Sequence, residues 1–325
     1  MASIPQTGQT LPQTGQRTDS ATEANWPPLP WAEWHQTATT LQLWMQVIGK
    51  IRLALATRTN HWWHVTLYPT CRGLTTSPMP YGSRMLQIDF DFLNHRLHLQ
   101  SSDGRQQGIA LQPMTVAEFY RQVMANLEQL EMPVHINPMP SEVADPIPFT
   151  QDEEHSAYQP EYAARYWQIL LRAEQAFTKF RARFTGKVSP AHLFWGGFDF
   201  AVTRFSGRMA PPHASVPHIP DRVVHTAYSH EVSSCGFWPG GPLLPEPLFY
   251  AYAYPTPAGF GDAPIEPPEA YFHGALGEFI LPYEAIRAYN DPTGILLRFL
   301  QSTYEAAANL GQWPRSALEA DSDDI

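Results

Sequence analysis

The chain has 325 residues, of which 43% are hydrophobic and 16% charged, so it is long enough to bury a sizeable core. Its net charge of −10 and its small number of lysines (Lys50, Lys179 and Lys187) argue against a nucleic-acid partner and against binding to an anionic membrane surface. There is no apolar run of about 18 residues that could span a membrane. With no signal-peptide pattern and too few cysteines for a disulfide framework, we expect a cytoplasmic protein.

The chain begins with a polar segment, residues 1–25, that is rich in Gln, Thr, Ser and Gly and predicts a disordered tail. We expect one large globular domain over residues 26–318. The acidic residues 319–325 predict a second, frayed tail.

The first half of the domain contains helix and strand patterns in turn. Apolar residues near a 3.6-residue period predict a helix over 34–56. Strand patterns follow at 61–69, 85–92, 95–100 and 107–112, separated by Pro and Gly turns. Thr115, with Glu118 in the capping-box position, predicts the start of a helix that ends near residue 131.

The second half repeats this mixture. Pro160 favours the first turn of a long helix that ends near residue 184. Strands are predicted at 192–205, 227–237, 248–254 and 278–281, and the last helices begin at Pro282 and at Asp291. The pattern predicts a mixed α/β (α+β) fold with largely antiparallel sheets and packed helices.

The two halves, 60–135 and 190–312, resemble each other. Each begins with a His-aromatic string, His61-Trp-Trp-His64 or His192-Leu-Phe-Trp195, and each ends with an amphipathic helix. This similarity indicates an ancient duplication of a strand-rich unit. A site between the two halves is then the natural geometry.

The histidines are the first candidates for chemistry. His61, His64 and His213 could hold a divalent transition metal if their imidazoles converge. In a regular strand, however, His61 and His64 point to opposite faces, so the pair works only if the segment is not extended. The alternative is that these are ordinary hydrogen-bonded histidines.

The segment 189–208 contains His192, Asp199, Arg204 and Arg208. On an unbroken strand His192, Arg204 and Arg208 share one face, and Asp199 lies on the other. A bulge at Gly196–Gly197 would reverse this phase and bring His192 together with Asp199. Either the Asp and Arg form a buried ion pair, or an arginine grips a carboxylate or phosphate in an anion pocket.

Two further segments carry alternatives. His230-Glu231 lies close to Cys235, so that a Cys–His nucleophile is conceivable, although a lone Cys near a His is usually packing. Tyr250, Tyr252 and Tyr254 alternate with alanine and would line one face of a strand. They form either a stacking platform for a planar ligand or a face covered by a helix.

Several strings together resemble one bacterial group, domain-of-unknown-function family 5996, from about residue 26 to residue 313. They are 26–31 (WPPLPW), 49–52 (GKIR), 60–64 (NHWWH), 72–78 (RGLTTSP), 203–208 (TRFSGR), 228–234 (YSHEVSS) and 301–306 (QSTYEA). The resemblance implies no activity and transfers no catalytic residue.

These observations favour an enzyme that acts on a small, anionic molecule. In this hypothesis a histidine serves as general base or as metal ligand, and an arginine holds the anion. The rival is a non-catalytic binding or interaction module with aromatic faces. The candidate catalytic residues are His64, His192, Asp199, Arg204, Arg208, His230 and Glu231.

Overall fold

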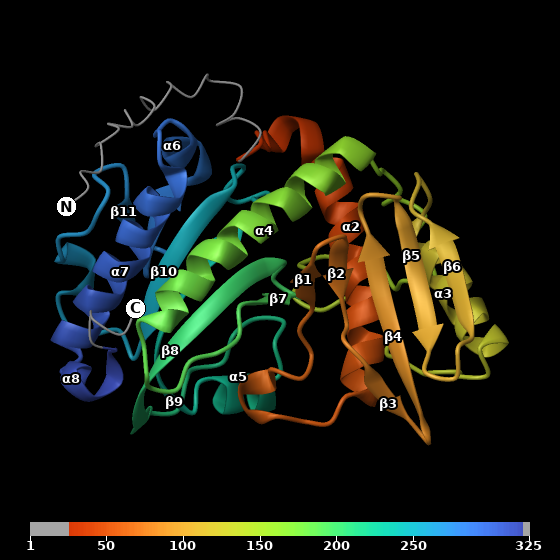
Figure 1. Cartoon of the computed structure of the whole chain (residues 1–325), viewed down its shortest axis with the longest axis horizontal. Helices are drawn as coiled ribbons and strands as arrows, with labels where there is room; N and C mark the ends of the chain where they lie inside the picture. The colour runs from red at the N-terminus through yellow and green to blue at the C-terminus, as the bar shows by residue number, and fades with distance from the viewer. Residues whose placement is uncertain (1–25, 321–325) are drawn as a thin grey trace, which may run out of the picture.

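A computed structural model describes residues 26–320, which form two antiparallel sheets and the helices around them (Figure 1). The predicted N-terminal tail, residues 1–25, and the acidic residues from 321 onward lie outside the described residues. Glu319, which the sequence places in the C-terminal tail, forms a bridge with Phe184 and accepts a hydrogen bond from Tyr304. The ordered chain therefore continues to Ala320.

The first sheet has the order β1-β2-β4-β5-β6, and β3 pairs with β4. All its pairs are antiparallel. Alternate residues of β4 and β5, among them Ile88, Phe90, Leu97 and Leu99, are buried, as expected for a sheet with one covered face. Its strands are β1 (Tyr68–Thr70), β2 (Gly73–Thr75), β3 (Met79–Tyr81), β4 (Arg84–Asp91), β5 (Arg96–Ser101) and β6 (Gln106–Ala110).

The second sheet has the order β11-β12-β10-β9-β8-β7 and is antiparallel throughout. Its long central strands β8, β9 and β10 are rich in aromatic and small residues, which suits a sheet that is packed closely on both faces. Its strands are β7 (His192–Phe194), β8 (Asp199–Met209), β9 (His230–Trp238), β10 (Leu248–Tyr254), β11 (Tyr271–His273) and β12 (Glu278–Pro282).

The two sheets meet at one pair of residues. Leu67 and Leu193 exchange backbone hydrogen bonds of 3.0 and 2.8 Å just before β1 and within β7. One continuous hydrophobic core includes residues from both sheets, such as Phe90 and Phe200. The strand orders of the two sheets differ, and the duplication stays a prediction.

The helices cover and connect the sheets. Helix α2 is buried along most of its length because α3, α4 and β3 all pack on it. Helix α4 crosses from the first sheet to the second, and α7 lies beside it against β9 and β10 (Figure 1). The helices are α2 (Trp31–Leu55), α3 (Val116–Gln129), α4 (Pro160–Ala182), α5 (Asp221–Ala227), α6 (Tyr283–Arg287), α7 (Pro292–Leu310) and α8 (Arg315–Leu318), with 3₁₀ turns η1 (Asn60–Trp62) and η2 (Phe260–Asp262).

The mixed α+β class with antiparallel sheets is confirmed, and the Thr115 cap is present, since its Oγ1 accepts from the Glu118 N–H. Three strand predictions need correction. The segment predicted as one strand over 192–205 forms β7 and the start of β8, joined by a turn. Residues 61–67 form a 3₁₀ turn and a loop, so that the strand begins only at Tyr68. The strand predicted over 227–237 begins only at His230, because Ala227 is the last residue of helix α5. Pro220 directly precedes this helix, which is too short to show a helical period in the sequence.

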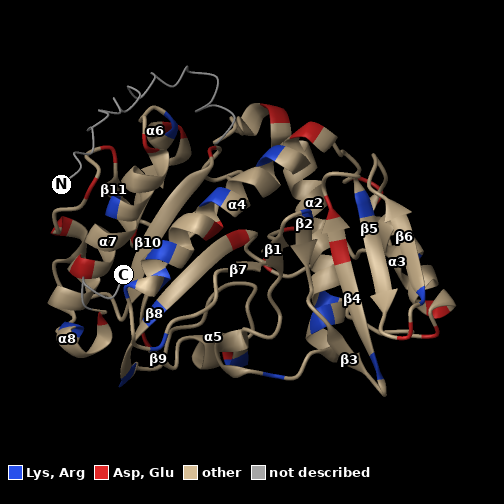
Figure 2. Cartoon of the chain, viewed as in Figure 1, with Lys and Arg blue, Asp and Glu red and all other residues tan. Residues whose placement is uncertain are grey.

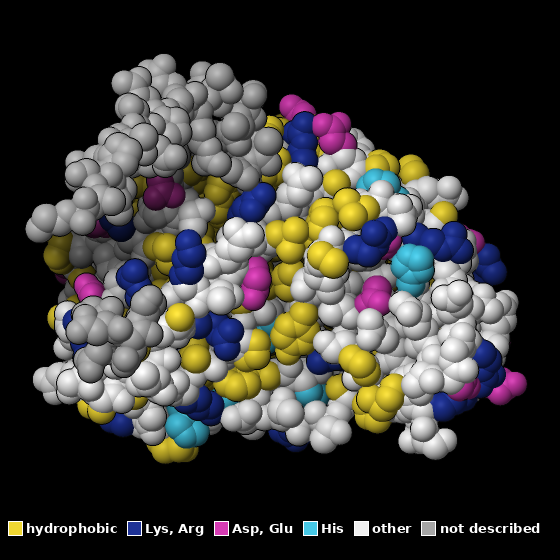
Figure 3. All heavy atoms as spheres, in the orientation of Figure 1, with side chains coloured by type: hydrophobic (Ala, Val, Ile, Leu, Met, Phe, Trp, Pro, Cys, Tyr) yellow, Lys and Arg dark blue, Asp and Glu magenta, His cyan; other side chains and the backbone are white. Residues whose placement is uncertain are grey.

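Charge is thinly spread over the described surface. Figure 2 shows isolated basic and acidic positions on most elements, and on the face seen in Figure 3 no continuous basic patch forms. Within residues 26–320, no helix has the length and apolar character that crossing a bilayer requires.

Candidate functional site

The second sheet has two faces of different character. Arg204, Cys235 and Phe237 point to the face under α4 and α7, where Phe177 stacks on Phe200 at 5.4 Å. Residues of the opposite parity, from Asp199 and Ala201 across to Tyr250 and Ile280, point to the other face. This second face carries a small separate apolar cluster, Ala201, Leu248, Tyr250 and Ile280.

Asp199 reaches this face because of the turn that precedes it. Residues 195–198 reverse the chain between β7 and β8, so His192 pairs with Ala201. Phe198, in the turn, takes a left-handed φ of 62°, a costly conformation for an aromatic residue. The Gly196–Gly197 segment therefore does place His192 and Asp199 on one face, through a hairpin turn rather than a bulge.

Glu142 approaches the same turn from a different part of the chain. Its carboxylate lies against Gly196, where an added Cβ would stand 1.9 Å from Oε1. A Cβ at Gly197 would lie 2.8 Å from Asp199 Oδ1 and 3.5 Å from Glu142 Oε2, so the two carboxyls are neighbours. Glu142 has a left-handed φ of 59°. Glycines at 196 and 197 thus make room for this carboxyl.

Helix α2 anchors the Glu142 loop. Gln46 exchanges two hydrogen bonds with the Ser141 backbone, at 2.9 and 2.8 Å, and Lys50 Nζ donates to Ser141 Oγ at 3.0 Å. Gln42 Nε2 donates to the Gly196 carbonyl at 2.7 Å. These bonds satisfy polar side chains on the buried helix α2. They also hold the loop that contains Glu142 next to the turn that contains Gly196.

Three tyrosines complete the group. Tyr250 Oη donates a 2.5 Å hydrogen bond to Asp199 Oδ2. Tyr250 and Tyr252 stack with centroids 6.1 Å apart, and the hydroxyls of Tyr252 and Tyr228 lie 2.9 Å apart. Glu278 lies on the same face as Tyr250, because Tyr250 pairs with Ile280. We call this group the carboxylate–tyrosine cluster: Glu142, Asp199, Glu278, Tyr228, Tyr250 and Tyr252.

The three carboxyls of the cluster hold their protons unusually tightly. Burial raises the pKa of Asp199 to about 6, although the hydrogen bond from Tyr250 opposes the change. Burial and then repulsion from Asp199 raise the pKa of both Glu142 and Glu278 to about 7. Asp199 and Glu278 nevertheless keep some accessible surface, and Glu142 is exposed as a whole residue although its carboxyl lies against Gly196, so solvent reaches the edge of the cluster. Near neutral pH it therefore holds protonated and ionised carboxyls side by side.

The model of a family of unknown function, DUF5996, matches residues 26–320, which is nearly the whole chain. The chain belongs to this family. Comparisons with curated proteins and with solved structures give no match. Membership of DUF5996 supplies no activity, so the remaining arguments rest on the residues themselves.

Among the histidines expected at the site, this DUF5996 chain brings His61 and His230 together, with ring centroids 5.7 Å apart. His61 is 5% exposed, and its Nδ1 lies 2.9 Å from the Ala227 carbonyl, so Nδ1 is the protonated nitrogen. Its Nε2 faces Lys187 Nζ at 2.6 Å. His61 and Trp62 both take left-handed backbone angles, with φ of 51° and 62°.

The other histidines are separate from this pair. His192 is fully buried beside Thr66, and burial lowers its pKa to about 3, so it is neutral. His64 accepts from the Thr59 N–H at 3.3 Å, and burial lowers its pKa. His213 lies between the rings of Tyr228 and Tyr254. Among residues 26–320 no group of three or more His, Cys, Asp or Glu side chains could hold a metal ion.

Arg204 lies on the helix-covered face, away from Asp199. Its guanidinium packs on the rings of Phe180, Phe184 and Tyr304 at 3.5, 4.9 and 4.2 Å and donates to the Phe180 carbonyl. It is completely buried, and burial lowers its pKa to about 10. Neither the expected Asp–Arg ion pair nor an open anion pocket forms around it.

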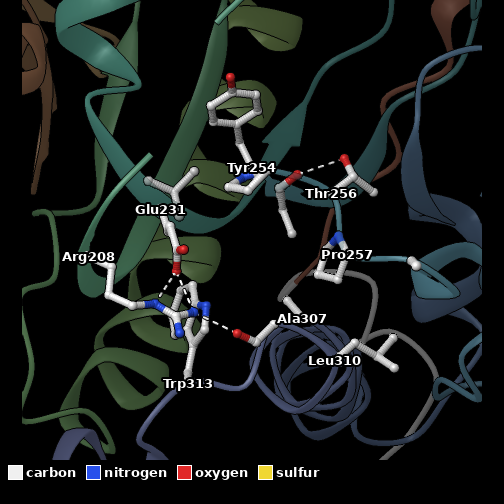
Figure 4. A pocket seen from close by; sticks show the side chains of 13 residues that line it. Arg208, Glu231, Tyr254, Thr256, Pro257, Ala307, Leu310 and Trp313 are labelled. Atoms are coloured by element: carbon white, nitrogen blue, oxygen red, sulfur yellow. Dashed lines mark hydrogen bonds and ion pairs between the residues drawn. The ribbon is translucent and has the colours of Figure 1, made fainter. Parts of the chain in front are cut away.

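Arg208 and Glu231 do meet, at the wall of a cavity of about 200 Å³ (Figure 4). Arg208 Nη2 lies 2.6 Å from Glu231 Oε2 and donates to the Gly311 carbonyl at 2.6 Å. Ser206 also donates to Glu231 at 2.8 Å. Trp313, Leu310 and Tyr254 are among the other residues that line it. The guanidinium is therefore occupied by this chain's own oxygens.

Cys235 is not placed to act as a nucleophile. It is 3% exposed on the helix-covered face, and burial raises the pKa of its thiol to about 12. Its Sγ donates to the Val202 carbonyl at 3.7 Å. A thiolate nucleophile paired with His230 has no support in this arrangement.

Sequence reasoning missed Glu142, Glu278 and Lys187. Glu142 lies in a proline-rich loop with no periodicity, and Lys187 lies in the link between α4 and β7. Glu278 could have been found, because it has the parity of Tyr250 once the β10–β12 pairing is known. The tyrosine alternation did indicate the face correctly, but not the carboxyls that surround it.

Proposed function

We propose that the carboxylate–tyrosine cluster binds a small, positively charged organic ligand, such as an amine. The observation that carries this proposal is the charge of the cluster. Glu142 and Glu278 each lie close enough to Asp199 to be repelled by it, and none of the three carboxyls forms an ion pair with a Lys, Arg or His of residues 26–320. A cation placed among them would offset the repulsion that raises the pKa of Glu142 and Glu278.

The tyrosines supply the second half of such a site. The stacked rings of Tyr250 and Tyr252 lie beside the carboxyls, and Tyr228 is joined to Tyr252 through its hydroxyl. A cation over an aromatic face gains about 0.5–2 kcal/mol, more where water is excluded. Aromatic faces combined with carboxyls favour an amine or a guanidinium over a bare metal ion, which needs several oxygens converging at one point.

This ligand has the opposite charge to the one expected from the sequence. That expectation rested on Arg204 and Arg208. Arg204 is buried beneath α4 and α7, and Arg208 is paired with Glu231. Neither guanidinium faces the cluster, so the negative charge of Asp199 and its neighbours is the better guide to the ligand.

A pair of probes that differ in charge but have similar shape tests the proposal. Phenethylamine and 3-phenylpropionate would be titrated into the full-length protein, with the melting temperature and calorimetry as measurements. We expect the amine to bind and to raise the melting temperature. Its affinity should increase as the pH rises from about 5 to about 8, because the carboxyls ionise in that range. Equal effects of the two probes, or none, would overturn the proposal.

Two variants locate the binding. Asp199→Asn and Glu278→Gln should each weaken amine binding by about tenfold, the equivalent of roughly 1.4 kcal/mol. Glu153→Gln removes one exposed carboxylate before α4 and serves as the matched control. Loss of binding in all three variants would show that only the overall charge matters, and would contradict a site at the cluster.

A second candidate function, acid–base catalysis on the same ligand, is supported by the pKa of Asp199. With a pKa of about 6, its carboxylate is close to the range in which a general base works best at neutral pH. Any turnover of a bound amine should then fall much further in Asp199→Asn than the loss of binding accounts for. Turnover that falls only as far as binding does would contradict a role of Asp199 as general base.

A further inference from the structure

Lys187 and His61 form a second group of polar side chains, which lies beside Phe205 toward the far end of β8 and shares no residue with the carboxylate–tyrosine cluster. Lys187 lies in the link between α4 and β7, and its carbonyl accepts from the Phe205 N–H at 3.0 Å. Its ammonium nitrogen lies 4.7 Å from the Phe205 ring and 5.5 Å from the Trp63 ring. Residues from three segments that are distant in sequence therefore position one amine.

The hydrogen bonding of His61 defines what it offers to Lys187. Because Nδ1 donates to the Ala227 carbonyl at 2.9 Å, Nε2 carries a lone pair directed at the amine, 2.6 Å away. Burial, and then the charges of Lys187 and His230, lower the pKa of His61. His61 is therefore a neutral acceptor that holds one N–H of Lys187 and leaves the rest of the amine open.

The surroundings of Lys187 differ from those of an ordinary surface lysine. Among residues 26–320 no carboxylate forms an ion pair with it, and partial burial lowers its pKa. Yet the residue as a whole is exposed, so a small molecule can reach the nitrogen. The left-handed conformations of His61 and Trp62 are unfavourable for residues with a side chain and must be maintained by packing, as is typical of functional sites.

We propose that Lys187 is a nucleophilic amine that forms an imine with a small aldehyde or ketone, and that His61 is the residue that positions it. The ammonium first loses one proton to water. The Nζ lone pair then attacks the carbonyl carbon, forming the C–N bond, while the carbonyl π electrons move to oxygen. The nitrogen then gives one of its protons to that oxygen, and a second proton from water converts the hydroxyl into a leaving water molecule, while the C=N bond forms and the nitrogen keeps one proton.

The product suits the same surroundings as the ammonium. A protonated imine is also a cation, so the contacts with the Phe205 and Trp63 rings remain favourable after the reaction. An amine desolvated among aromatic side chains is a recognised way to obtain a nucleophilic lysine. The reaction requires no oxidant and no cofactor.

The small number of lysines makes the test direct. The full-length protein would be treated with limiting propanal and sodium cyanoborohydride, which reduces any imine to a stable N-propyl group. Peptide mass spectrometry then measures the modification at Lys50, Lys179 and Lys187 separately. At about pH 7 we expect Lys187 to be modified several times faster than Lys179, which is exposed on α4, because burial lowers the pKa of Lys187 and His61 holds its amine in place. Equal or faster modification of Lys179 would overturn the proposal.

The positioning role of His61 has its own measurement. His61→Asn keeps a residue that tolerates the left-handed backbone but removes the ring acceptor. In this variant the pH at which Lys187 becomes half as reactive as its maximum should fall, because its ammonium loses an acceptor, and its maximal rate should fall, because the amine is no longer held in place, while Lys179 is unaffected. An unchanged pH profile would exclude the role of His61. If the variant does not fold, the comparison between Lys187 and Lys179 in the unaltered protein still decides the reactivity of Lys187.

Discussion

Tyr250 Oη donates a 2.5 Å hydrogen bond to Asp199 Oδ2, across two strands of the second sheet. The bond favours the ionised form of Asp199, yet burial outweighs it and the pKa rises to about 6. The phenol of Tyr250, which faces the same carboxyl, has a raised pKa for the same reason, since burial and the charge of Asp199 disfavour the phenolate. Tyr250 is therefore the proton donor and Asp199 the acceptor, and neither side chain forms an ion pair with a basic residue of the described chain.

Replacing Asp199 with Asn should stabilise the protein at alkaline pH. The folded-state pKa of about 6 lies above the ordinary aspartate value of 3.8, so the folded state binds more protons between these values and stability falls as pH rises through them. Asn can still accept from Tyr250 but carries no charge. We expect a gain of about 3 kcal/mol at about pH 8 and little at about pH 4.

Urea unfolding at the two pH values measures this effect. Glu153→Gln, an exposed carboxylate, should show the same small change at both. A gain from Asp199→Asn that did not depend on pH would mean that the raised pKa of Asp199 is not its source.

Gly49→Ala should destabilise the protein, although Gly to Ala inside a helix normally gains up to about 1 kcal/mol. An added Cβ would lie 2.3 Å from Trp195 Nε1. The indole cannot move away freely, because Nε1 donates to the Val65 carbonyl at 2.7 Å. We expect a loss of about 1–3 kcal/mol in the free energy of unfolding.

Gly274→Ala is the matched control, since nothing lies within 4 Å of its added Cβ and its φ is not in the left-handed region. Its free energy of unfolding should stay within about 0.5 kcal/mol of the unaltered protein. Equal stability of the two variants in urea would show that the Trp195 indole leaves room for a side chain at position 49.

Glu231→Gln should turn the cavity of Figure 4 into an anion site. Glu231 occupies the position that an anion would take beside Arg208, whose guanidinium is held by the Gly311 carbonyl at the end of α7. Without the carboxylate, a phosphate ion could pair with the guanidinium fork. Inorganic phosphate should then raise the melting temperature of Glu231→Gln more than that of the unaltered protein.

The double variant Glu231→Gln with Arg208→Gln provides the control for this prediction, because it lacks the guanidinium. If phosphate raised its melting temperature as much, the anion would bind elsewhere. The anion pocket expected from the sequence would then have no basis at Arg208.

The sequence by itself determined the elements with a clear period or cap. Helix α4, from Pro160, and strands β4, β5 and β10 follow from local apolar spacing and turn residues. The loop over 61–67 did not, because its His and Trp residues have strand-like preferences while the left-handed angles of His61 and Trp62 depend on packing against α5. Tertiary contact overrides local propensity there.

Only the tertiary structure decided which polar residues meet. Glu142, Asp199 and Glu278 lie far apart in the sequence, and their shared position depends on the Gly196–Gly197 turn and the pairing of β10 with β12. The same holds for Lys187 and His61, which no pattern links. Spacing along the chain fixes the direction of a side chain within one element, but the charge and burial around it depend on neighbours supplied by other elements.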